Sequence, residues 1–125
     1  MTSLTSNRYV LLMDDDIPTE WLRAVLPLAV LAAVAEEDTY GYAVAQRLQA
    51  GGLGTVKGGT LYPVLNRLEA DGLLTSSWRE GVGGPGRKFF AATPAGRDHL
   101  ARRSAAWHTF TEQARSLLPD PRSTR

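Results

Sequence analysis

The side chains of this chain that are best suited to chemistry are polar and basic groups near its middle. Within residues 57–72, leucines recur at i, i+4 and i+7, while Tyr62, Pro63, Asn66 and Arg67 lie off this apolar stripe. Arginine is well suited to bidentate contacts with phosphate and guanine, and a helix in the major groove must present polar side chains. This face therefore suits DNA recognition, although an ordinary solvated helix face has a similar composition.

Groups that could bind phosphate lie at the start of the same segment. The side chain of Lys57 and the backbone amides of Gly58 and Gly59 would meet a phosphate at a helix N-terminus. The Tyr62 hydroxyl would donate a hydrogen bond to another phosphate. Such contacts hold a protein on the DNA backbone without reading its sequence.

A second basic element follows this segment directly. Residues 73–79 and 87–93 are predicted to be strands, and the glycine-rich segment 80–86 between them indicates a hairpin with a flexible tip. Arg79, Arg87 and Lys88 surround a tip without bulky side chains, which would let the hairpin approach the DNA backbone or enter the minor groove. A solvated hairpin with scattered charges is the alternative, but the position after the polar-faced helix favours DNA binding.

Other chemistries lack the residues that they require. The G-x-G-x-x-G spacing at 81–86 would need a helix to start there, but a strand is predicted, so we reject a dinucleotide site. His99 and His108 are nine residues apart on one predicted helix and point to roughly opposite sides, so one metal ion cannot bind both. The chain has no Cys, and no catalytic arrangement stands out. We therefore expect no enzyme, no cofactor and no metal site.

The elements that must position these groups follow from the hydrophobic pattern. A helix is predicted from Pro18 to residues 36–38, and Pro27 should kink it or break it in two. A short helix is predicted next at 42–48. The third helix should begin near Gly59 or Thr60, because Pro63 is tolerable only in the first turn of a helix. Residues 1–17 are expected to be a flexible arm and 119–125 a flexible tail.

The last predicted helix begins with a Thr93 cap and Pro94, runs to about residue 118, and carries one long apolar face. Leu100, Trp107 and Ala114 recur at a spacing of seven. This face exceeds what three short helices can cover, so we expect it to pack against a second copy of the chain, with burial against the first helix as the alternative. The predicted dimer interface consists of Trp21, Leu22, Val25, Leu100, Trp107, Phe110, Ala114 and Leu117.

Composition and charge fit one small folded unit, in which we expect residues 18–93 to form a winged helix-turn-helix DNA-binding domain and residues 94–118 to form a C-terminal dimerisation helix. The chain has 125 residues, 43% of them hydrophobic, which suits one domain. Its net charge of +1 conceals an acidic segment 1–40, with 2 basic and 7 acidic residues, and a basic remainder, with 12 and 6. The longest apolar run is about half of a membrane span, so we expect a soluble, cytoplasmic protein.

Several motifs together closely resemble the PadR family of transcriptional regulators, in its shorter subgroup with a single C-terminal helix. They are Tyr40–Gly41–Tyr42, the run 59–73, the segment 86–90 and Thr93–Pro94–Ala95–Gly96. One departure is Phe90, where the family commonly has tyrosine. The resemblance implies a mostly α fold with a small β-hairpin, and a homodimeric repressor that in some relatives is released by a small aromatic or drug-like ligand.

The sequence thus predicts a homodimer that binds a double-stranded DNA operator containing an inverted repeat. We do not expect it to bind a membrane. Trp107, with Trp21, is the candidate site for an aromatic effector, and packing in the core or at the interface is the alternative role for Trp107. The rival hypotheses are a winged-helix module that binds proteins instead of DNA, and a small enzyme, which the missing catalytic groups disfavour. The residues predicted to contact DNA are Tyr42, Lys57, Thr60, Tyr62, Pro63, Asn66, Arg67, Arg79, Arg87 and Lys88.

Overall fold

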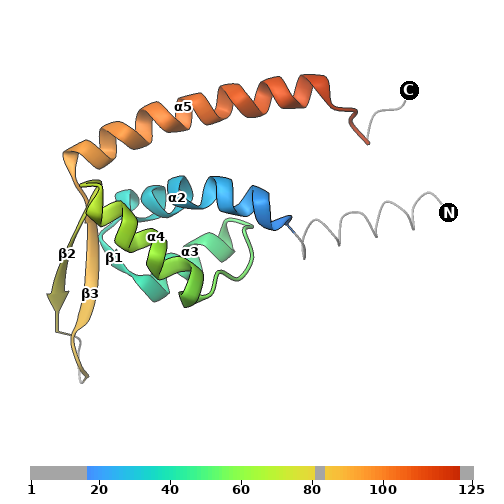
Figure 1. Cartoon of the computed structure of the whole chain (residues 1–125). Helices are drawn as coiled ribbons and strands as arrows, with labels where there is room; N and C mark the ends of the chain where they lie inside the picture. The colour runs from blue at the N-terminus through green and yellow to red at the C-terminus, as the bar shows by residue number, and fades with distance from the viewer. Residues whose placement is uncertain (1–16, 81–83, 122–125) are drawn as a thin grey trace.

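The computed structural model describes residues 17–80 and 84–121, and Figure 1 shows how the helices lie around a small sheet. Helices α2 (Thr19–Glu36), α3 (Gly41–Ala50) and α4 (Gly58–Ala70) precede a hairpin of β2 (Leu74–Arg79) and β3 (Arg87–Ala92). The long helix α5 (Pro94–Leu117) completes the order. The mostly α, winged helix-turn-helix fold predicted from the sequence is confirmed. The predicted arm, apart from Ile17, lies outside the described residues.

A short strand that the sequence does not predict, β1 (Thr39–Tyr40), lies between α2 and α3. It pairs antiparallel with β3, with Thr39 opposite Phe90 and Tyr40 opposite Phe89, so the strand order is β1-β3-β2. Two residues are too few to show the alternation by which strands are recognised in a sequence. Because β3 is the central strand, β1 fixes the junction of α2 and α3 to the hairpin.

The apolar core lies among α2, α3, α4 and one face of the sheet. The leucine stripe of α4 is buried as predicted, and Phe90 from β3 is only 1% exposed. A ring buried this deeply needs a hydrogen-bond partner if it carries a hydroxyl, so phenylalanine suits this position. The other core residues that are almost fully buried include Leu26, Val30, Leu31, Val34, Val44, Leu48, Leu61, Leu65, Leu68 and Leu74.

Two prolines lie inside helices: Pro27 does not divide its helix, and Pro63 corrects the predicted start of its own. Helix α2 continues through Pro27 without being broken in two. Helix α4 begins at Gly58, earlier than predicted, so Pro63 lies in its second turn and not in its first. Each proline removes one hydrogen bond, to the carbonyl four residues earlier. Those residues, Arg23 and Gly59, are exposed, so their carbonyls can bind water and the helices tolerate the loss.

The start of α5 is fixed by a cap and by a missing side chain. The Thr93 hydroxyl accepts a hydrogen bond from the Gly96 amide (2.9 Å) and donates one to the Gly72 carbonyl (2.7 Å), while Pro94 occupies the first helical position. Gly96 is buried against the backbone carbonyl of Leu73, which a Cβ at position 96 would strike. Helix α5 therefore leaves the sheet at a point where only glycine fits.

Arg47 from α3 binds the last turn of α2. Its guanidinium donates to the carbonyl oxygens of Ala33 (2.6 Å) and Glu37 (3.1 Å), and to the Glu37 carboxylate (3.3 Å). The last carbonyls of a helix have no partner inside the helix and carry the negative end of its dipole. Arg47 thus satisfies groups that would otherwise need solvent, and it joins α3 to α2.

Two further arginines reach the same end of α2 from other elements. Arg97 of α5 donates to the carbonyl of Ala35 (3.1 Å), and Arg79 of β2 pairs with the Asp38 carboxylate (3.2 Å). Figure 1 shows that this end of α2 lies beside the sheet and the beginning of α5. We call residues 33–38 with their three arginine partners the arginine junction.

We predict that Arg47→Ala lowers the free energy of unfolding by about 2–3 kcal/mol, because it removes charged hydrogen bonds to partly buried carbonyls. Arg102→Ala is the matched control, since within residues 17–80 and 84–121 Arg102 forms an exposed i,i+4 ion pair with Asp98 (3.0 Å) and no other. That control should cost less than about 0.5 kcal/mol. Urea denaturation followed by circular dichroism measures both, and equal losses would show that Arg47 does not hold α2 and α3 together.

Candidate nucleic-acid interface

The face of α4 opposite the core presents the polar residues that the sequence predicts. Tyr62, Pro63, Asn66 and Arg67 are all exposed. Arg67 pairs with Asp71 (3.4 Å), but both side chains are largely exposed, so this ion pair is weak and its arginine can exchange partners. Side chains that can donate and accept hydrogen bonds therefore extend from a helix that is anchored from beneath by three leucines.

Tyr62 is held in place by α3. Gly41, the first residue of α3, is buried against the Tyr62 ring, and a Cβ at position 41 would meet the ring and its hydroxyl. The glycine is therefore required for this close approach of the two helices. The neighbouring Tyr42 is 65% exposed. The two tyrosines thus lie together where α3 begins, on the side of the molecule that carries the polar face of α4.

The N-terminus of α4 offers unpaired backbone donors. Lys57 is the N-cap residue, and its side chain caps no amide. Its carbonyl accepts hydrogen bonds from the amides of Thr60 and Leu61, both at 2.9 Å, while Gly58 and Gly59 before them are exposed. The first turn contains no acidic residue. This is the electrostatic setting in which a helix N-terminus binds a phosphate.

The basic residues of the hairpin, which the sequence groups together, are divided between the two faces of the sheet. Arg79 lies opposite Arg87 on the outer face, and Lys88 lies on the inner face. The Arg79 guanidinium stacks on the Phe89 ring (4.4 Å) in addition to its ion pair with Asp38. The structure thus places Arg79 in the arginine junction rather than beside α4.

Arg87 and Lys88 remain close to the helices. Arg87 stacks on the Tyr40 ring (4.5 Å). Lys88 lies 3.7 Å from Glu69 of α4, which also accepts a hydrogen bond from the Ser76 hydroxyl (2.6 Å). Glu69 therefore fixes the distance between the hairpin and α4, while Lys88 provides a positive charge between them.

Two aromatic residues of this surface are not among the predicted site residues. Trp78 of β2 is 73% exposed, and with Tyr40 it lines a cleft between the hairpin and the tyrosines of α3 and α4. The signal in the sequence is weak, because it consists of one tryptophan between polar residues near a glycine-rich turn. Only the tertiary structure brings Trp78 to the tyrosines.

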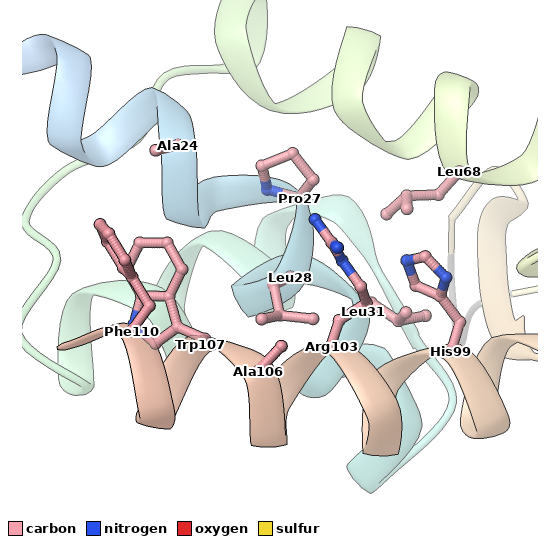
Figure 2. Close-up of a pocket in the computed structure, with 10 residues that line it drawn as sticks. All are labelled: Ala24, Pro27, Leu28, Leu31, Leu68, His99, Arg103, Ala106, Trp107 and Phe110. Carbon is pink, nitrogen blue, oxygen red and sulfur yellow. The ribbon is translucent and has the colours of Figure 1, made fainter. Parts of the chain in front are cut away.

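A separate groove, shown in Figure 2, lies between α2 and α5. Its volume is about 370 Å³, and it is mostly apolar. Trp107 and Phe110 lie together at one end, with ring centroids 5.9 Å apart, and Arg103 and His99 extend from α5 toward α2 at the other. Its remaining lining residues are Ala24, Pro27, Leu28, Leu31, Leu68 and Ala106.

The residues predicted for the dimer interface differ in exposure. Trp21, Phe110 and Leu117 are 65%, 59% and 82% exposed. Leu22, Val25, Leu100, Trp107 and Ala114 are partly buried within the protomer. Of the two residues predicted to bind a ligand, Trp107 lines the groove and Trp21 does not. Packing of α5 on α2 thus uses part of the apolar face and leaves the rest uncovered.

No helix in the described part of the chain has the length and apolarity that crossing a membrane requires. His108 is exposed, whereas His99 is partly buried and lines the groove. In residues 17–80 and 84–121, His, Asp and Glu side chains do not gather in groups of three or more that could hold a metal ion. The described surface thus offers groups for non-covalent recognition.

Comparison with known proteins gives consistent matches. The model of the transcriptional regulator PadR-like family matches residues 30–102. A transcriptional regulator of Mycobacterium tuberculosis is 42% identical over 99 residues, which are 79% of this chain and 88% of that protein.

Solved structures agree with this match. A PadR-like transcriptional regulator from Bacillus cereus superposes with a TM-score of 0.73 at 26% identity, covering 82% of this chain and 99% of that one. A PadR family transcriptional regulator from Eggerthella lenta gives a TM-score of 0.71 at 30% identity, covering 94% and 96%. Both structures superpose with this chain over nearly their full length.

Proposed function

This chain belongs to the PadR-like family of transcriptional regulators, and from that premise we propose that it is a homodimeric repressor that binds an inverted repeat in DNA. Its family consists of regulators and not enzymes, as the sequence predicts. The observation that carries the proposal is the exposed polar face of α4 directly beside a hairpin that bears Arg87 and Lys88. Recognition without chemistry is sufficient for repression, because a bound dimer blocks the access of polymerase to the promoter.

In the proposed complex, α4 enters the major groove. Asn66 and Arg67 face the base edges, because asparagine pairs well with adenine and arginine with guanine. Lys57, Thr60, Tyr42 and Tyr62 contact phosphates at the start of the helix. Arg87 and Lys88 of the hairpin contact the adjacent backbone or minor groove. The core beneath α4 is rigid, so these contacts are largely preformed.

The expected operator is an inverted repeat whose half-sites lie about 10 bp apart, since a two-fold dimer presents two copies of α4 about one helical turn apart. DNase I footprinting on the DNA upstream of the chain's own gene checks this. Protection should cover both half-sites at the same protein concentration. Protection of one unpaired half-site, or none at low salt, would refute the dimeric DNA-binding model.

Dimerisation is proposed to use the uncovered apolar residues at the beginning of α2 and along α5. Trp21, Phe110, Leu117 and Leu118 are all more than half exposed, and large apolar side chains gathered on one side of a small protein mark an interface. Phe110 and Leu117 lie seven residues apart, which places them on one stripe of α5. A second α5 packed along this stripe would cover it.

Leu117→Asp should therefore give a monomer, because a carboxylate buried at the interface without a partner costs about 3–5 kcal/mol. Ala105→Asp is the control, since it adds the same charge to an exposed position of α5 away from the stripe. Analytical ultracentrifugation reports the mass, and a gel shift reports the accompanying loss of DNA binding. If Leu117→Asp and Phe110→Asp both remain dimeric, the interface lies elsewhere.

A small planar aromatic effector is proposed to bind in the groove at Trp107. The volume of about 370 Å³ lies within the range of small-molecule sites, and the Trp107 and Phe110 rings offer apolar stacking surfaces. Arg103, which makes no ion pair with another described residue, would bind an acidic group on the effector. The Trp107 of a second protomer would close the groove if two α5 helices cross there.

Titration of phenolic acids and planar aromatic cations against tryptophan fluorescence tests the effector. We expect an acid to quench fluorescence with sub-millimolar affinity, to lose this effect in Trp107→Ala and to release DNA in a gel shift. Trp21→Phe controls for the exposed tryptophan of α2. Quenching that persists in Trp107→Ala would leave Trp107 with a packing role only.

A further inference from the structure

The cleft beside the hairpin is lined by exposed aromatic side chains, and one of them, Trp78, has no role in the DNA contacts proposed above. We call it the wing cleft, and its volume is about 460 Å³. We propose that it holds one strand of the DNA backbone, with the Trp78 indole packed against a deoxyribose. This inference rests on the proposed binding of DNA and adds a contact to it. The cleft is lined by Tyr40, Tyr42, Tyr62, Trp78, Gly86, Arg87 and Lys88.

The exposed rings of the wing cleft come from three elements. Trp78 of β2 is 73% exposed, Tyr42 of α3 is 65% exposed and Tyr62 of α4 is 45% exposed. Single exposed apolar residues are common, but rings that converge from separate elements on one cleft indicate a surface that is covered in the functional state. Within residues 17–80 and 84–121, no other ring packs on Trp78.

The charge and hydrogen-bonding groups of the cleft suit a polyanion with flat apolar parts. Its lining includes the cations Arg87 and Lys88, and the Glu69 carboxylate, which is 3.7 Å from Lys88, lies outside that lining. Tyrosine hydroxyls and the indole N–H can donate to phosphate oxygens, and the ring faces can pack on sugars. A nucleic-acid strand alternates these two kinds of group, phosphate and sugar, at a regular spacing.

The location of the cleft favours a strand of duplex DNA as the occupant. It lies between the Tyr62 side of α4 and the β3 residues Arg87 and Lys88, which are the two elements proposed to contact the duplex. A strand that passes from one of these contacts to the other must cross the cleft. The register of the hairpin places Trp78 opposite Lys88 and on the same face of the sheet, so the indole and the cation border the same cleft.

Gly86 keeps the wing cleft open at its hairpin end. A Cβ at this position would lie 3.3 Å from the Arg79 carbonyl and 3.8 Å from Cε3 of Trp78. Gly86 therefore lies beside the indole without a side chain that would crowd it. The Trp78 side chain remains 73% exposed and can receive a sugar.

Trp78→Ala is expected to weaken binding of a 30 bp duplex of arbitrary sequence about tenfold, the loss typical of an aromatic contact to a nucleic acid. The factor should be the same at every salt concentration, because the indole carries no charge. Arg87→Ala should instead flatten the dependence of log K on log salt by about 0.9 per lost phosphate contact. Fluorescence anisotropy measures both, and Ser77→Ala, an exposed change on the opposite face of β2, is the control.

A second measurement does not depend on the alanine variant being folded. In Trp21→Phe/Trp107→Phe, which leaves Trp78 as the emitting tryptophan, a saturating duplex should reduce acrylamide quenching at least twofold. If the duplex leaves quenching unchanged, or if folded Trp78→Ala binds as tightly as the wild type, the wing cleft is not a DNA contact. Failure of the wild type to bind any duplex would instead overturn the proposed function.

Discussion

The last carbonyl groups of α2 have no partners inside the helix, and arginines of α3 and α5 donate hydrogen bonds to them, while an arginine of β2 pairs with the Asp38 carboxylate just beyond the helix. Arg47 brings α3 to this turn, Arg79 brings the hairpin, and Arg97 brings the beginning of α5. The apolar core holds the helices together without specifying direction, because hydrophobic contact is not directional. The arginine junction adds hydrogen bonds, which are directional, at the point where all these elements meet.

The distance from α4 to the hairpin depends on contacts among several elements, including those of the arginine junction. Glu69 ties α4 to β2 and β3 through Ser76 and Lys88, and Arg79 ties β2 to α2. The groups on the polar face of α4 and those on the hairpin therefore keep a fixed relation to each other. A surface that must match the spacing between a major groove and its neighbouring backbone benefits from this fixed relation, because deforming DNA to fit a mismatched surface costs free energy.

The sequence predicts the local features well and the tertiary ones less well. The leucine stripe of α4 and the cap at Thr93 depend on neighbours within a few residues, so periodicity and capping chemistry reveal them. Strand β1, the ion pair of Arg79 with Asp38 across 41 residues, and the approach of Trp78 to Tyr62 depend on partners far along the chain. The position of Pro63 is likewise not predictable from local sequence. Pro63 leaves the Gly59 carbonyl without a helical partner, and the structure tolerates this because Gly59 is exposed.

The direction in which α5 leaves the sheet depends on the lack of a Cβ atom at Gly96. Since any side chain at position 96 would strike the Leu73 carbonyl, this angle cannot be adjusted by small steps of substitution at the junction. In related homodimers with the same glycine at the start of α5, the separation of the two copies of α4 would have to change through the length of α5 or through the dimer interface. The distance between operator half-sites would then change in steps, because each residue added to α5 changes its length and direction by the rise and turn of a helix. Such relatives would form separate groups that differ in half-site spacing.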